Sequence, residues 1–177
     1  MVIKQGVYDG NFIHNRFAYE QFRKNVSSCG NIVAFRAPMY VKDALIDLED
    51  TLSNDFIHSQ DSINFCWEIP GLCPFGAVSF QRLFNTSIAN ILSQFIKKGI
   101  DDKVRSEGKV SVSITYSKEN VALGHTGINI IAGDKAPGFA YSSNLTDNQA
   151  DEFMNIVIDH FNTEVKDQFI ATTKILV

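Results

Sequence analysis

The sequence lacks the features of disulfide-rich, membrane-spanning and strongly basic proteins. Its three cysteines have no C-x-x-C spacing, which is typical of a reducing, cytoplasmic compartment rather than of a disulfide framework. No segment approaches the length of a membrane span, and the N-terminus has no cationic stretch followed by an apolar run. The net charge of -4 argues against a polyanion-binding surface. We therefore expect no membrane association and no general nucleic-acid binding.

The order of the expected elements indicates a mixed fold. The 177 residues, 45% of them hydrophobic, suffice for one domain over residues 1–177. β-branched and aromatic runs predict strands over residues 31–36, 62–69, 109–116 and 121–131. Apolar residues at helical spacing and a Thr146/Gln149 capping box predict helices over residues 42–52, 79–98 and 146–170. This order predicts an α+β fold, in which helices pack on one side of a mainly antiparallel sheet.

The first of these strands is expected to be short. Its run of β-branched and aromatic residues leads to Arg36 and is followed by Ala37-Pro38. Proline has no N–H to give to a strand ladder and restricts the residue before it. The sequence therefore predicts that this strand ends at Arg36.

The most site-like residues lie in the strands over 109–116 and 121–131. Polar side chains alternate there with valine and isoleucine, and one lysine, Lys109, precedes Ser111 and Ser113. His125 and Gly127 belong to the Gly-His-Thr-Gly segment of the following strand. A lysine and hydroxyl groups on a rigid sheet are suited to gripping a small anionic ligand. The alternatives are that Lys109 faces solvent and that His125 is a neutral structural histidine.

Other motifs are less specific. Arg36 is suited either to an ion pair with the acidic cluster of Asp47, Glu49 and Asp50 or to a bidentate grip on a phosphate or carboxylate. Those acids resemble a solvated helix face more than a metal site. The sequence has no GxxxxGK and no GxGxxG motif, so the usual phosphate-binding loops are absent. Neither Cys66 nor Cys73 has a basic neighbour that would activate a thiol nucleophile.

Six segments carry a family resemblance. They are, in chain order, VAFRAPM, ALIDLEDTL, FQRLF, GIDDKV, GKVSVSI and HTGINI. They resemble a small family known as domain of unknown function number three hundred and sixty-six, over most of residues 3–175. The layout is also remotely similar to the catalytic domain of lipoate and biotin protein ligases, which has the class II synthetase-like fold.

The ligase resemblance implies roles for several residues. Lys109 matches the lysine that holds the activated carboxylate and the phosphate of an acyl-adenylate, which makes it the implied catalytic residue. Asp102 lies where these enzymes place oxygen ligands near magnesium and nucleotide, so ATP and magnesium are the implied cofactors. The implied substrate-binding residues are Arg36, Ser111, Ser113, His125 and Gly127. The chain departs from the ligases at residues 37–39, where Ala-Pro-Met replaces a run of glycines.

Two functions follow from the resemblance. The first is activation of a small carboxylate-bearing metabolite through an adenylate-like intermediate. The second is a catalytically silent relative that binds a metabolite, a nucleotide or a protein partner. Retention of Lys109 favours the first, and the missing glycines favour the second. Exposed edge strands would also allow a homodimer.

Overall fold

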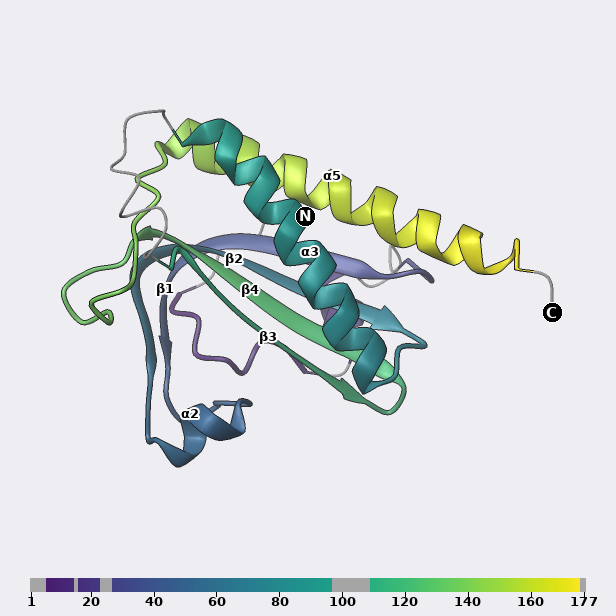
Figure 1. Cartoon of the computed structure of the whole chain (residues 1–177), viewed down its shortest axis with the longest axis horizontal. Coiled ribbons are helices and arrows are strands. Elements are labelled where there is room, and N and C mark those ends of the chain that lie inside the picture. Colours follow the sequence, from purple (N-terminus) through teal and green to yellow (C-terminus); the bar gives the residue numbers. More distant parts are fainter. Residues whose placement is uncertain (1–5, 15, 23–26, 97–108, 176–177) are drawn as a thin grey trace.

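The structure is a computed structural model that describes residues 6–14, 16–22, 27–96 and 109–175. In chain order its elements are α1 (Phe17–Phe22), β1 (Asn31–Val41), α2 (Leu48–Leu52), β2 (Ile57–Pro70), α3 (Pro74–Phe95), β3 (Ser111–Lys118), β4 (Val121–Ile131) and α5 (Asp147–Thr172). The strands form an antiparallel sheet in the order β1-β2-β4-β3, crossed by α3 and α5 (Figure 1). The predicted α+β fold with an antiparallel sheet is confirmed.

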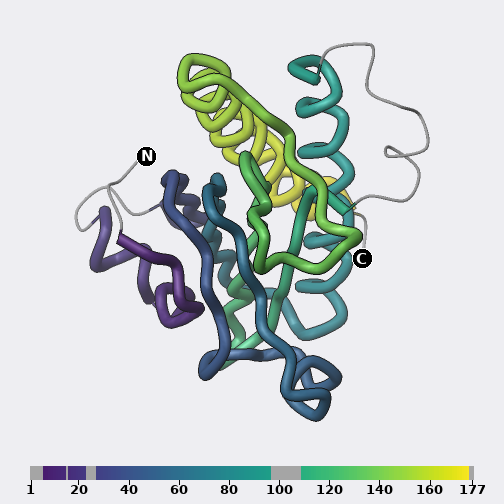
Figure 2. Tube along the Cα trace, turned by 90° about the vertical axis from the view of Figure 1, so that its left-hand side faces the viewer, coloured from purple at the N-terminus to yellow at the C-terminus, as the bar shows by residue number. Residues whose placement is uncertain are grey.

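The sheet lies between two layers of chain. Helices α3 and α5 cover one face, and the N-terminal segment with α1 covers part of the other (Figure 2). We call these the helix face and the N-terminal face. The core of the helix face is rich in aromatic side chains, among them Phe65, Trp67, Phe80, Phe84, Phe153 and Phe161. None of the helices among the described residues is long and apolar enough to cross a membrane.

Strand β2 shows how the sequence distributes side chains between the two faces. Alternate residues of a strand point to opposite sides of a sheet. Ile63, Phe65, Trp67 and Ile69 accordingly pack in the core of the helix face. The intervening positions point to the N-terminal face, and they are Ser62, Asn64, Cys66 and Glu68. The N-terminal face of this central strand is therefore unusually polar for a buried surface.

The prediction that the first strand ends at Arg36 is wrong, because β1 continues to Val41. Its register against β2 shifts between Ala37 and Met39, so Pro38 lies at an irregularity of an edge strand. The Pro38 carbonyl accepts a hydrogen bond from the Tyr8 N–H at 2.9 Å, and the Tyr40 N–H donates to the Tyr8 carbonyl at 2.9 Å. A proline is tolerated at such a position because no N–H is required of it there. This pairing holds Tyr8 over the N-terminal face.

The prediction of a helix over residues 42–52 is also wrong for its first half, because α2 begins only at Leu48. Asp47 is its N-cap, and one carboxylate oxygen accepts from the backbone N–H of Glu49 at 2.8 Å. Leu48 and Leu52 are exposed, whereas Leu45 packs against the core of the N-terminal face. The three leucines therefore do not form one buried apolar face, which was the basis for predicting a single helix over residues 42–52.

The close packing of β2 on β4 generates a stability prediction. Gly124 lies opposite Trp67, and a Cβ at Gly124 would overlap the indole ring. Because Trp67 is fully buried, we expect Gly124→Ala to lower the free energy of unfolding by about 3 kcal/mol. Urea denaturation measures this change. Gly138→Ala is the control, since nothing lies within 4 Å of the added Cβ, and equal effects of the two substitutions would contradict the packing.

Candidate functional site

Two adjoining cavities contact the N-terminal face. The first has a volume of about 50 Å³ and is lined by His125, which we use to name it. The second has a volume of about 280 Å³ and is lined by Lys109, and we call it the Lys109 cavity. Four residues line both cavities, which places the cavities side by side, and these residues are Met39, Asp50, Ile57 and Val112. The larger cavity alone approaches the lower limit of small-molecule sites, roughly 300 Å³.

Lys109 stands at the mouth of the larger cavity on a fixed backbone. Its N–H donates to the Phe139 carbonyl at 2.7 Å, and its carbonyl accepts from the Tyr141 N–H at 2.9 Å. The side chain is exposed. Within the part of the chain that the structure describes, no carboxylate lies within ion-pair distance of its ammonium group. Among the described residues, no carboxylate neutralises the charge of Lys109.

Ser111, Ser113 and Gly127 take different positions around these cavities. Ser111 lines the Lys109 cavity. The Ser113 hydroxyl accepts hydrogen bonds from Gln81 at 3.0 Å and from Asn85 at 2.7 Å, both on α3, so it joins β3 to that helix. Gly127 leaves room for its neighbours, because a Cβ there would lie 3.2 Å from the His125 ring and from the Met39 side chain.

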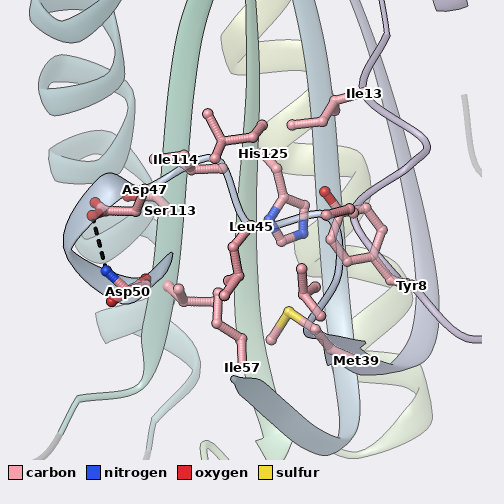
Figure 3. A pocket seen from close by; sticks show the side chains of 15 residues that line it. Tyr8, Ile13, Met39, Leu45, Asp47, Asp50, Ile57, Ser113, Ile114 and His125 are labelled. Carbon is pink, nitrogen blue, oxygen red and sulfur yellow. Dashed lines mark hydrogen bonds between the residues drawn. The ribbon is translucent and has the colours of Figure 1, made fainter. Parts of the chain in front are cut away.

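His125 is buried in the N-terminal face, and its ring projects into the smaller cavity (Figure 3). The ring stacks on Tyr8, with centroids 4.0 Å apart and planes 12° from parallel. Its Nε2 atom lies 2.9 Å from Oδ1 of Asn64. Burial lowers the pKa of His125 to about 3, so the ring is neutral at physiological pH. Burial also raises the pKa of neighbouring Tyr8 and Cys66, which keeps these groups neutral as well.

Arg36 lies on the opposite face of the sheet from His125. Its register partner is Ile63, a residue of the helix-face core, whereas His125 pairs with Cys66 of the N-terminal face. The guanidinium donates to both carboxylate oxygens of Asp61 and, at 2.6 Å, to Asp147 at the start of α5. These contacts raise the pKa of Arg36. Arg36 lines neither cavity, so the structure does not bring it together with Lys109, Ser111 and His125.

The metal-binding expectation falls on a residue that the structure does not describe. Asp102 lies outside the described residues. Among those that are described, no three histidine, cysteine, aspartate or glutamate side chains are placed to hold a metal ion together.

Sequence reasoning missed the residues that orient His125. Asn64 and Ser62 lie in the expected strand over residues 62–69, but they are not among the predicted site residues. The available signal was alternation, because SINFCWEI places a polar or small polarisable side chain at every second position. Tyr8 carried no comparable signal, since its contact with His125 depends on the pairing of the N-terminal segment with β1.

The geometry of Arg36 predicts a structural ion pair. In a double-mutant cycle with Arg36→Met and Asp61→Asn, we expect a coupling energy of about 1 kcal/mol, because both side chains are partly exposed to solvent. The matched cycle with Asp147→Asn should give a smaller value, since 88% of that side chain is exposed. Urea denaturation provides the four stabilities of each cycle. A coupling near zero for Arg36 and Asp61 would show that the contact has no structural role.

Comparison with known proteins agrees with this architecture. A protein of unknown function from Pyrococcus horikoshi has a TM-score of 0.82 at 23% identity, over 100% of this chain and 97% of its own. A biotin protein ligase from Leishmania major in complex with biotin has a TM-score of 0.53 at 9% identity, over 89% of this chain and 72% of that one. A putative lipoate protein ligase from T. acidophilum has a TM-score of 0.53 at 13% identity, over 94% and 85%.

At these identities the likeness shows the fold alone, which is that of lipoate and biotin ligase catalytic domains. No curated protein matches the chain. The family comparison is more specific, because it extends over residues 1–176 and agrees with the six segments identified in the sequence. The chain therefore belongs to the family described as a domain of unknown function, DUF366.

Proposed function

We propose that this protein binds a small carboxylate-bearing molecule on the N-terminal face, with the carboxylate at Lys109. The observation that carries the proposal is a lysine without an ionic partner among the described residues, at the mouth of a cavity of about 280 Å³. A lysine ammonium group is a compact positive charge with three donors, and it forms charge-assisted hydrogen bonds with a carboxylate.

The remaining walls of the Lys109 cavity suggest the body of the ligand. Apolar side chains form most of the lining, including Met39, Phe56, Ile57, Val112, Pro137 and Phe139. Asp50 and Asp55 line the α2 side. A ligand carboxylate is repelled from that side and attracted to Lys109. The cavity is therefore suited to an aliphatic acid that lies along β3 with its charged end at Lys109.

ATP-dependent activation of that acid is the finer hypothesis. It is supported by the ligase-like fold and by the position of Lys109, which would then also hold the phosphate of an acyl-adenylate. In this reading ATP and magnesium are cofactors, with Asp102 as a metal ligand. The catalytically silent alternative is supported by β1, which continues through residues 37–39 as a strand and pairs with Tyr8 instead of forming a glycine-rich loop.

Replacing Lys109 tests the binding site. We expect Lys109→Met to weaken the binding of straight-chain fatty acids of four to nine carbons by roughly ten- to a hundredfold, the size of a lost charge-assisted hydrogen bond. Isothermal titration calorimetry measures the affinity. Lys118→Met, at the other end of β3, is the control with an exposed lysine, and both variants should melt like the wild type. Equal affinities for wild type and Lys109→Met would show that Lys109 is an ordinary surface residue.

A second assay separates the two functional classes. Release of pyrophosphate from ATP, dependent on the bound acid and lost in Lys109→Met, would support activation. Binding of the acid without pyrophosphate release would support the silent relative.

A further inference from the structure

The hydrogen bonds around His125 determine which ring nitrogen carries the proton. The Ser62 hydroxyl donates its hydrogen to the Ala37 carbonyl at 2.7 Å. Its oxygen can then only accept, and it accepts from Nδ2 of Asn64 at 3.1 Å. The same amide nitrogen also points to the Ala37 carbonyl, at 3.3 Å. The amide of Asn64 is therefore oriented with its oxygen towards His125.

This orientation leaves the other nitrogen of His125 as a hydrogen-bond acceptor. Because Oδ1 of Asn64 accepts, Nε2 of His125 must be the protonated nitrogen, and Nδ1 of the neutral ring keeps its lone pair. In the described part of the chain Nδ1 makes no hydrogen bond. His125 is only 3% exposed, and this small exposed part of the ring lines the smaller cavity. His125 thus presents a ring nitrogen without a hydrogen bond in the described residues to a cavity whose lining is partly apolar and also includes Asp47 and Asp50.

We propose that His125 is a specificity-determining residue, and that its Nδ1 atom accepts a hydrogen bond from a hydroxyl or amide N–H at the far end of the ligand. The inference rests on the proposed function, because it places the carboxylate of the same ligand at Lys109. The ligand class is then an aliphatic carboxylic acid with a hydrogen-bond donor at the opposite end.

The dimensions and walls of the two cavities support one elongated ligand. Lys109 and Ile114, the register partner of His125, are five residues apart, which corresponds to roughly 16 Å along a strand. Met39, Ile57 and Val112 line both cavities with apolar side chains, and the carboxylate-bearing Asp50 also lines both. The smaller cavity, of about 50 Å³, admits a compact end group rather than a second large body.

A ligand that lacks the hydrogen-bond donor would bind less tightly. Its apolar end would displace water from Nδ1 without replacing the hydrogen bond, and a site built to hydrogen-bond a ligand rejects the analogue that lacks the group. Ser62 and Asn64 are positioning residues in this arrangement, because they act on the ligand only through the orientation of His125.

The test compares acids that differ only in the end group. The probes are straight-chain ω-hydroxy acids and the unsubstituted acids with the same number of heavy atoms, over a series of chain lengths, titrated calorimetrically. At the best length we expect wild type to bind the hydroxy acid about tenfold or more tightly than its partner. In His125→Phe, which keeps an aromatic ring beside Tyr8, this preference should be lost or reversed.

A second variant keeps the test informative if His125→Phe does not fold. Leu45 lies outside α2, is only half-buried and lines the smaller cavity. Leu45→Phe should fill that cavity and reduce the affinity of the long hydroxy acids, while the shortest acids bind as before.

The outcomes separate this inference from the proposed function. Equal binding of both acids of every pair, with both weakened in Lys109→Met, would overturn the role of His125 and leave the carboxylate site intact. A hydroxyl preference that depends on His125, with the affinities of all acids unchanged in Lys109→Met, would support the His125 subsite and overturn the proposed carboxylate site. Absence of binding by every acid of the series would overturn both.

Discussion

Strands β2 and β4 are covered on both faces, and a polar group on either strand is costly unless another group inside the protein pairs with it. The helix face meets this constraint largely with apolar and aromatic side chains. On the N-terminal face, a chain of hydrogen bonds runs from Ser62 through Asn64 to His125, whereas Oε2 of Glu68 has no hydrogen-bond partner among the described residues. Because each member fixes the orientation of the next, the last member presents a defined acceptor to the cavity.

Other residues of the N-terminal face lie beside these hydrogen-bonded side chains. The pairing of Tyr8 with β1 places its ring on His125, and the short helix α2 leaves Leu45 free to line the same cavity. Lys109 lines the larger cavity and differs from His125 in its chemistry, because it is a charged hydrogen-bond donor that is exposed to solvent. In the proposed site, Lys109 would bind the charged end of one elongated molecule and His125 the opposite end. In this proposal the ligase-like fold provides the sheet, whereas these side chains provide the chemistry.

Local patterns predicted the elements that depend on local physics. The Thr146/Gln149 capping box begins α5 where expected, and β4 has the predicted bounds. The helix expected from residue 79 begins earlier, because Pro74 occupies a first-turn position in which proline needs no partner. Lys109, Ser111 and His125, which the sequence predicts as site residues, line two adjoining cavities, and their roles in binding stay predictions. The sequence alone does not show that Arg36 lies on the other face of the sheet, because the face of a strand residue depends on strand register. The ion-pair partners of Arg36 are also distant in the sequence, 25 and 111 residues away.

The protonation of His125 is the most direct test of this account. Two-bond nitrogen–proton correlations of the imidazole rings, with His125 assigned by comparison with His125→Phe, report which nitrogen carries the proton. The account predicts a neutral ring with the proton on Nε2, unchanged as the pH is lowered from about 8 to about 4, because burial lowers the pKa to about 3. A proton on Nδ1, or a ring that titrates near the ordinary histidine value of 6.5, would contradict it.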